Sequence, residues 1–197
     1  MSTVPHSGTR YIRDSISEEG YSVVKVRGPH PEETDLIWGH FDSTNEDWMV
    51  RIQPLFPDLR HFVVVRNPIH TLCTHYADTN SILGVSNKVR DRRRDEIIGR
   101  MYRFYTIQDA YIKQYSPYIH RVEDPIASLG DWLGIGLKGT GGRYSRPNEL
   151  REAVNSRDVD QCFQIAGPVW EWFVQECSDR IAPLYRDKLG YDFWWLP

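Results

Sequence analysis

The chain has few cysteines, little net charge and no long apolar run. Its three cysteines form no metal-ligand spacing, and their odd number favours a compartment where thiols stay reduced. A formal net charge of −3 argues against a general attraction to nucleic acid or to an anionic membrane. No stretch reaches transmembrane length, and the amino terminus lacks the layout of a secretion signal. We therefore expect a soluble, cytoplasmic protein that binds neither nucleic acid nor a membrane.

What the chain does have is enough apolar surface for a sizeable core. It contains 197 residues, of which 40% are hydrophobic and 13% aromatic. That length and composition predict a single globular domain over residues 1–197. The many tryptophans and tyrosines favour large buried rings and surfaces on which a ring-bearing ligand can stack.

Apolar runs and helical periodicities alternate along the chain. The predicted strands cover 21–26, 35–41, 61–66 and 118–122, the last of them an edge strand. The predicted helices cover 9–18, about 68–77, 89–115, 126–133 and 156–189, the last interrupted at Pro168 and Pro183. The segments 78–87 and 136–147 are predicted to be loops, and a short helix is expected before Leu59. This alternation predicts a parallel sheet with helices on both faces.

The continuous apolar run 61–66 is typical of a central parallel strand that is buried on both faces. Ligands of such sheets bind beyond the carboxyl ends of the strands. The loops after Val4, Phe41 and Arg66 are therefore expected on one rim. These loops also contain the polar residues of greatest interest for binding and catalysis.

The first of these loops predicts an anion site. Ser7, Gly8 and Thr9 connect an apolar start to a helix, whose first N–H groups and dipole attract negative charge. Hydroxyl donors and the charges of His6 and Arg10 suit a phosphate or sulfate group. The alternative interpretation is an ordinary turn with a helix cap.

Several motifs together resemble the sulfotransferase family. The first is Pro5-His6-Ser7-Gly8-Thr9-Arg10-Tyr11, similar to that family's 5′-phosphosulfate loop. The second is Val63-Val64-Val65-Arg66-Asn67-Pro68 with Thr74 eight residues after Arg66, similar to its 3′-phosphate motif. Three further matches are Val122-Glu123-Asp124-Pro125 with Leu133-Gly134-Ile135, Lys138-Gly139-Thr140-Gly141-Gly142, and Leu189-Gly190-Tyr191. Their order and spacing cover most of the chain.

The resemblance implies a three-layer α/β/α fold with a central parallel sheet, of the P-loop NTPase-like kind. It implies 3′-phosphoadenosine 5′-phosphosulfate as the donor, 3′,5′-adenosine bisphosphate as the product, and no metal. The expected 5′-side cradle is His6, Ser7, Gly8, Thr9 and Arg10. Arg66 and Thr74 would hold the 3′-phosphate, Tyr11 would stack on adenine, and Lys138, Gly139 and Gly142 would close over the donor. The alternatives are an ion pair at Arg66, core packing at Tyr11 and a flexible loop at Lys138.

Sulfuryl transfer also needs a base and a cation at the bridging oxygen. His40 is the candidate base, with His30 as its rival. His6 stands where the family usually has Lys or Arg, and Arg10 is expected to compensate with its permanent charge. Leu137 and Val122 replace an Arg and a Tyr of the family pattern.

Three interpretations of function follow from these residues. The leading one is a sulfotransferase acting on a hydroxyl or amine of a small-molecule or glycan acceptor. A non-catalytic nucleotide-binding module of the same fold is the second, and a P-loop kinase the third, although the chain lacks the Gly-x-x-x-x-Gly-Lys-Ser/Thr string. The basic run 90–94 is either a solvated helix start or an attraction for an anionic acceptor. The sequence discloses neither the acceptor nor the oligomeric state.

Overall fold

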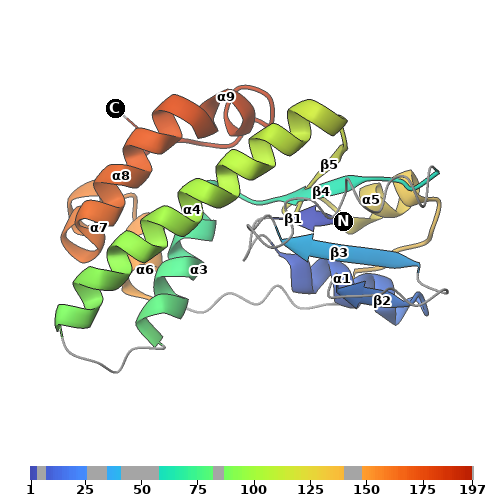
Figure 1. Ribbon diagram of the computed structural model, residues 1–197, viewed down its shortest axis with the longest axis horizontal. Helices are drawn as coiled ribbons and strands as arrows, with labels where there is room; N and C mark the ends of the chain where they lie inside the picture. Colours follow the sequence, from blue (N-terminus) through green and yellow to red (C-terminus); the bar gives the residue numbers. More distant parts are fainter. Residues whose placement is uncertain (4–7, 26–34, 41–57, 82–86, 140–147, 197) are drawn as a thin grey trace. The chain divides into compact units, whose positions relative to one another are not determined.

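A computed structural model describes residues 1–3, 8–25, 35–40, 58–81, 87–139 and 148–196 (Figure 1). Contacts between these residues group the chain, predicted as one domain, into two compact units. The first unit is Met1–Arg66 with Phe104–Tyr144, and the second is Asn67–Arg103 with Ser145–Pro197. Each unit is described by itself below.

Strands and helices alternate in the first half of the chain, and helices alone follow in the last quarter. The strands are β1 (Ser2–Thr3), β2 (Val23–Lys25), β3 (Leu36–His40), β4 (Phe62–Val65) and β5 (Tyr118–Arg121). The helices are α1 (Thr9–Glu18), α3 (Pro68–Ser81), α4 (Asn87–Tyr115), α5 (Ile126–Leu133), α6 (Glu149–Asn155), α7 (Val159–Ala166), α8 (Pro168–Glu176) and α9 (Ala182–Tyr185). A π-helical segment, η1 (Cys177–Ile181), joins α8 to α9.

Described strands of the first unit form one five-stranded sheet in the order β2-β3-β1-β4-β5. Every neighbouring pair in it is parallel. The chain is thus of mixed α/β class with a parallel sheet, as the alternation of elements predicted. The run 61–66 forms the inner strand β4, and β5 lies at an edge as expected.

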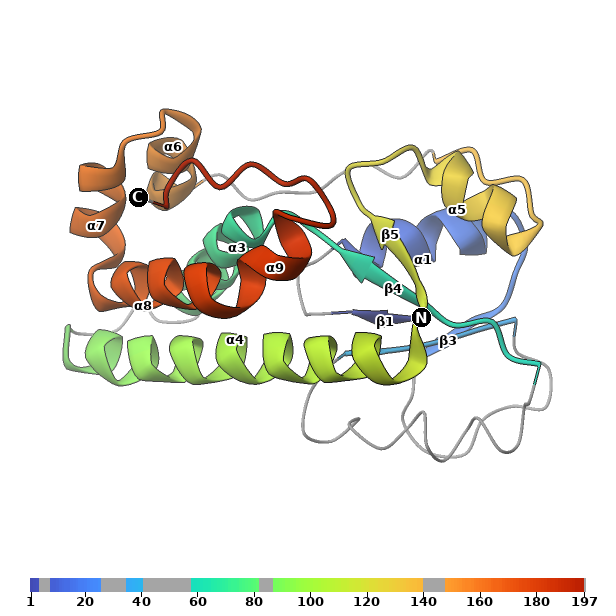
Figure 2. The ribbon, with the colours of Figure 1, turned by 90° about the horizontal axis from the view of Figure 1, so that it is seen from above.

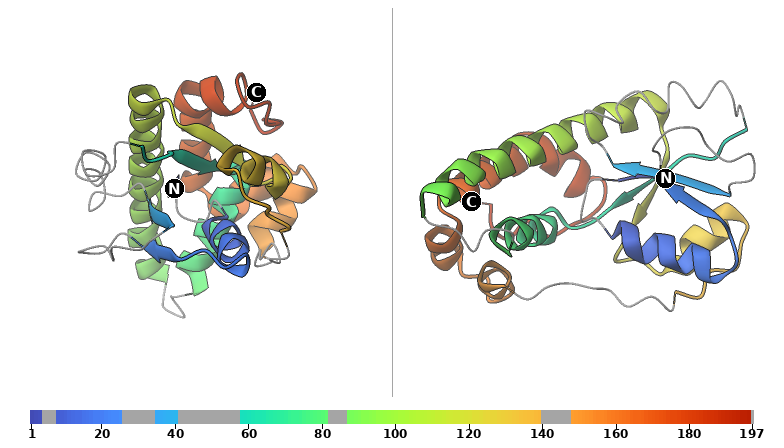
Figure 3. Two further views of the ribbon diagram at one scale, coloured as in Figure 1. Left: turned by 90° about the vertical axis from the view of Figure 1, so that its right-hand side faces the viewer. Right: turned by 60° about the horizontal axis from the view of Figure 1, so that its bottom comes forward.

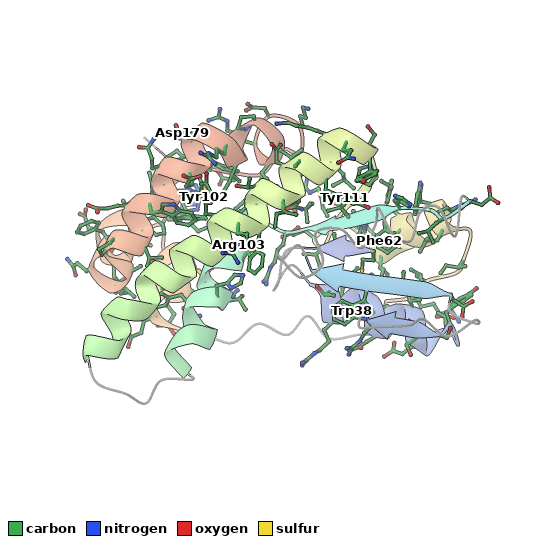
Figure 4. All side chains as sticks on the ribbon, viewed as in Figure 1. Trp38, Phe62, Tyr102, Arg103, Tyr111 and Asp179 are labelled. Carbon is green, nitrogen blue, oxygen red and sulfur yellow. The ribbon has the colours of Figure 1, made fainter. Side chains whose placement is uncertain are left out.

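The core of the first unit fills one face of this sheet. Phe62 and Val64 of β4 and Trp38 of β3 belong to a buried cluster that includes apolar side chains of α1 and α5. These two helices lie together on that face (Figures 2 and 3), and Figure 4 shows Trp38 and Phe62 on their strands. Val63 and Val65 alternate to the opposite face and are also 0% exposed. The apolar run of β4 is therefore explained by burial on both faces.

The C-terminal end of α4 lies on the side of the sheet opposite α1 and α5 (Figure 3). Only the part of α4 from Phe104 onward belongs to the first unit. Its side chains at Phe104, Tyr105, Gln108 and Tyr111 recur at helical spacing and are buried. This is the face that the periodicity of the segment 89–115 predicted.

Helices make up the described part of the second unit. Its core contains Val169, Trp170 and Phe173 of α8, and the C-terminal segment adds aromatic rings to it. Trp195 stacks on Phe173 at 6.1 Å and on Phe193 at 4.7 Å between ring centroids. The tail is thereby fixed to α8 by ring packing rather than by strand pairing.

Several boundaries differ from the sequence expectations. Residues 78–81, predicted as loop, continue α3, and the helix α6 was not predicted at all. Pro168 begins α8 after a break at Gly167, as expected, but Pro183 lies inside the first turn of α9 and causes no interruption there. The helical run reaches Pro183 through the π-helical segment η1, whose hydrogen-bond pattern differs from that of an α-helix. The predicted short helix before Leu59 and the loop residues 140–147 lie outside the described residues.

Candidate functional site

The strand order of the first unit has a topological switch point between β1 and β4. The connection that leaves β1 leads through α1 to β2, on one side of the sheet. The connection that leaves β4 leads to β5, on the other side. Where two such connections diverge, a crevice opens beyond the carboxyl ends of the strands, and ligands of parallel α/β sheets bind there. The two motifs singled out in the sequence follow β1 and β4.

The register of the sheet places several predicted site residues at the carboxyl ends of the strands, which we call the carboxyl edge of the sheet. Thr3, the last residue of β1, is in register with His40 on one side and with Val64 on the other. His40 is thus the last residue of β3, beside β1, and Arg66 follows the last residue of β4. Arg66 is partly buried. The predicted base and one predicted phosphate ligand therefore belong to the same edge of the sheet as the loop that follows β1.

Gly8 ends that loop in a conformation that suits glycine. Its φ is 87°, in the left-handed region, and it is the N-cap residue of α1. A Cβ at this position would lie 2.2 Å from Cγ2 of Val122, so no larger residue fits. The backbone N–H of Val122 donates to the carbonyl of Val65 at 2.8 Å. Contacts thus link Gly8 through Val122 to the strand end that precedes Arg66.

The N-terminus of α1 is suited to an anion. Among the described residues no side chain caps it at Gly8, and its first turn contains no acidic residue. Its dipole is therefore not offset by a local negative charge. Arg10 is exposed in the same turn, whereas Thr9 is buried with 8% of its surface exposed.

Tyr11 and Gly139, both predicted to contact the donor, are close to each other. A Cβ at Gly139 would lie 2.9 Å from the hydroxyl of Tyr11 and 2.5 Å from Cγ2 of Ile126. Gly139 also has a left-handed φ of 65°. Tyr11 packs against the apolar core, which is the alternative to adenine stacking that the sequence left open. Lys138 is exposed beside Gly139.

Leu137 belongs to the apolar core, with 5% of its surface exposed. The sulfotransferase pattern has an arginine at this position. A side chain at residue 137 points into packed apolar surroundings, where an unpaired cation would be costly. The chain thus has no substitute cation at position 137 itself.

Thr74 belongs to the second unit, on α3. Its hydroxyl donates to the carbonyl of His70 at 3.0 Å and accepts a hydrogen bond from Nη2 of Arg151, also at 3.0 Å. Asn67, which precedes α3, caps that helix by accepting from the N–H of Ile69 at 3.1 Å. Sequence reasoning missed Arg151, because it lies 77 residues from Thr74 with no motif around it.

Some predicted site residues cannot be compared with the structure. His6, Ser7, Gly142 and the alternative base His30 lie outside the described residues. His40 is described as part of β3, but its side chain is not. The side chains of the basic run 90–94 are likewise outside the description, although the run belongs to α4. Their assigned roles remain predictions.

The resolved pKa shifts include those of two thiols in the second unit and of one histidine in the first. Burial raises the pKa of the Cys177 thiol, and burial together with the charge of Asp158 raises the pKa of Cys162 to about 11. Burial also lowers the pKa of His61, which precedes β4 at the opposite end of that strand. Neither of these two thiols is a candidate nucleophile at neutral pH, because a thiol reacts as its thiolate.

Two searches of the described residues found nothing. No group of three or more His, Cys, Asp or Glu side chains among them is arranged to hold a metal ion. None of the described helices has the length and apolar character needed to cross a membrane.

Comparisons with protein-family models, with curated proteins and with solved structures gave no match for this chain. The assignment of a function therefore depends on the residues and contacts given above.

Proposed function

We propose that the chain is a sulfotransferase that uses 3′-phosphoadenosine 5′-phosphosulfate as its donor and a hydroxyl or amine as its acceptor. The observation that carries the proposal is the switch point between β1 and β4. The Gly8 loop follows one of these strands and Arg66 follows the other. Two motifs that the sequence predicts to bind anions, far apart along the chain, thus follow neighbouring strands. We further propose that the sheet and its helices form the three-layer, P-loop-like fold that the resemblance implies.

The residues at the carboxyl edge of the sheet can bind the donor and add positive charge beside it. When bound, the donor would supply a sulfuryl group attached to a phosphate. The first-turn N–H groups of α1 would bind its 5′ side, and Arg10 would add a permanent positive charge there. Arg66, and Thr74 by resemblance, would bind the 3′-phosphate. His6 would take the position of the usual Lys or Arg.

His40 would act as the base. A ring nitrogen of its neutral imidazole would accept the proton of the acceptor hydroxyl. Its support is its place at the carboxyl end of β3, in register with the end of β1. Replacement by Ala is expected to lower kcat about 10²- to 10⁴-fold with little change in donor affinity.

A calorimetric titration with 3′,5′-adenosine bisphosphate tests the proposal. Wild-type protein is expected to bind in the micromolar range, about −8 kcal/mol. Arg66→Ala should weaken binding at least about tenfold, because a charge-assisted hydrogen bond is lost. Arg60→Ala is the matched control, since exposed Arg60 precedes β4 and donates to the carbonyl of Trp132 at 2.8 Å. Absence of binding by folded wild-type protein would refute the proposal.

The second candidate function is a nucleotide-binding module without turnover. It is favoured by buried Leu137, where the family pattern has a cation, and by His6. Two results together would identify it. The chain would bind 3′,5′-adenosine bisphosphate tightly, and it would form none of this product from the donor with any acceptor in a panel of alcohols, phenols, amines and glycans. Binding of ATP that requires Mg²⁺ would instead indicate the kinase alternative.

A further inference from the structure

Two side-chain hydrogen bonds connect α3 to the start of α6 within the second unit. Nη2 of Arg151 donates to the hydroxyl of Thr74 at 3.0 Å. Nδ2 of Asn148, the N-cap residue of α6, donates to the carbonyl of Cys73 at 3.2 Å. Asn148 also accepts from the N–H of Arg151, which fixes the backbone from which the arginine side chain extends. Arg151 is thereby held beside Thr74.

The guanidinium of Arg151 is incompletely satisfied. Its Nε is inaccessible to solvent and has no hydrogen-bond partner among the residues that the structure describes. Among the described residues no carboxylate forms an ion pair with it. Glu149 and Glu152, its neighbours on α6, are exposed, and residues one or two positions apart on a helix do not face each other. Within the described part of the chain, Arg151 thus keeps a buried N–H without an acceptor and a permanent positive charge without a carboxylate partner.

We propose that Arg151 binds a phosphate group beside Thr74. Guanidinium suits this ligand because its N–H groups match two oxygens of a phosphate at once. Nε would gain its missing acceptor, and the Thr74 hydroxyl could turn its proton from the His70 carbonyl to a phosphate oxygen. Since Nε is covered in this structure, binding requires Arg151 to change its side-chain rotamer. Assigning this group to the 3′-phosphate of the donor rests on the proposed function.

Two kinds of probe test separately whether Arg151 binds an anion and whether that anion is the 3′-phosphate of the donor. Inorganic phosphate tests the anion site alone, by thermal unfolding and by the side-chain Nε–H signal of Arg151 in ¹H–¹⁵N spectra. The pair 3′,5′-adenosine bisphosphate and 5′-AMP tests the assignment, because the two differ only in the 3′-phosphate. The variants are Arg151→Met and Arg151→Lys, with Arg186→Met as the control. Arg186 is an exposed arginine of the same unit that pairs with Asp187 at 2.8 Å.

In wild-type protein we expect phosphate to shift the Arg151 signal and to raise the unfolding temperature. Arg151→Met should abolish both effects and weaken bisphosphate binding about tenfold to a hundredfold, while 5′-AMP affinity stays unchanged. Arg151→Lys should keep part of the affinity because it keeps the charge. The control should behave as wild type.

Other results have distinct meanings. If wild-type protein binds neither nucleotide but phosphate still acts through Arg151, the anion site stands and the proposed function fails. If phosphate acts equally on wild type and on Arg151→Met, the inference is overturned, and Arg151 is only a brace between α3 and α6. An ion pair with Asp78, one turn after Thr74 in the sequence, would also overturn it; Asp78→Asn would then destabilise the protein as much as Arg151→Met.

Discussion

The two units obtain their internal order from different hydrogen bonds. In the first unit, the strands are joined by backbone ladders, and helices cover the sheet through apolar contacts. In the second, whose described residues include no strand, side chains bond to the backbone of distant helices, as when the hydroxyl of Tyr76 donates to the carbonyl of Ile165 at 2.8 Å. The first unit has bonds of this kind in addition to its ladders, such as that from Arg60 to the carbonyl of Trp132. A ladder depends on a local run of β-branched residues, whereas each of these side-chain bonds depends on one residue. Single substitutions should therefore have more specific consequences in the second unit.

The units also differ in where polar groups gather. In the first unit, Arg10 and Arg66 follow the carboxyl ends of β1 and β4 along the chain. In the second, Arg151 of α6, whose buried Nε has no partner among the described residues, donates through Nη2 to Thr74 of α3. An anion site at a sheet edge follows from topology, whereas one between helices requires side chains from separate segments.

The largest expected effect concerns the aromatic core of the second unit. Trp195→Ala removes a ring that is 3% exposed and stacks on Phe173 and Phe193. It should lower the free energy of unfolding by about 3–5 kcal/mol, the usual result of a large cavity. Trp194→Ala is the matched control, because Trp194 is only partly buried and should cost less. Urea denaturation measures both.

Hydrogen exchange on the same Trp195→Ala protein tests how separate the units are. Faster exchange in α8 and η1, with β4 unchanged, would mean that the second unit opens by itself. An equal increase in β4 would contradict the comparison and show that the two units unfold as one cooperative domain.

An intermediate effect is expected at the sheet edge of the first unit. Gly8→Ala combines a left-handed backbone with a clash against Val122, and should cost about 2–4 kcal/mol. Gly20→Ala is the control, since Gly20 has a φ of 91° but a Cβ there would meet nothing within 4 Å. It should cost only about 1 kcal/mol. Val122→Ala in the Gly8→Ala background should recover part of the loss, and no recovery would show that the strain is in the backbone alone.

The smallest expected effect is a pH dependence of the stability of the second unit, which arises from a buried thiol. All three cysteines, Cys73, Cys162 and Cys177, belong to the second unit. Folding raises the pKa of Cys162 from 9.0 to about 11, so its stabilising contribution is complete below pH 9 and is lost as pH rises through about 11. The protection of the α7 amides, measured relative to their intrinsic base-catalysed exchange rates, should therefore decrease over this range. Cys162→Ala should reduce that pH dependence, and an unchanged dependence would contradict the assignment to this thiol.

Much of the fold could be predicted because its signals are local. The helix 9–18, the helix 126–133 and the inner strand within 61–66 follow from periodicity, from Gly20 and Gly134, and from β-branched runs. The continuation of α3 through 78–81 was missed because polar residues have weak propensities that helix context overrides. The helix α6 was missed because it is short and follows a glycine-rich segment, although Asn148 is a recognisable cap in retrospect.

The sequence by itself determined the α/β class, the inner position of β4 and the presence of glycine where the chain turns into α1. These depend on residues close together in the chain, whose propensities act before any tertiary contact forms. Only the tertiary structure decided which residues meet within each unit. Val122 contacts Gly8, and Arg151 contacts Thr74, across separations that no local pattern encodes. Such contacts arise from the packing of distant segments, and so does the order of the strands that places the Gly8 loop and Arg66 at neighbouring strand ends.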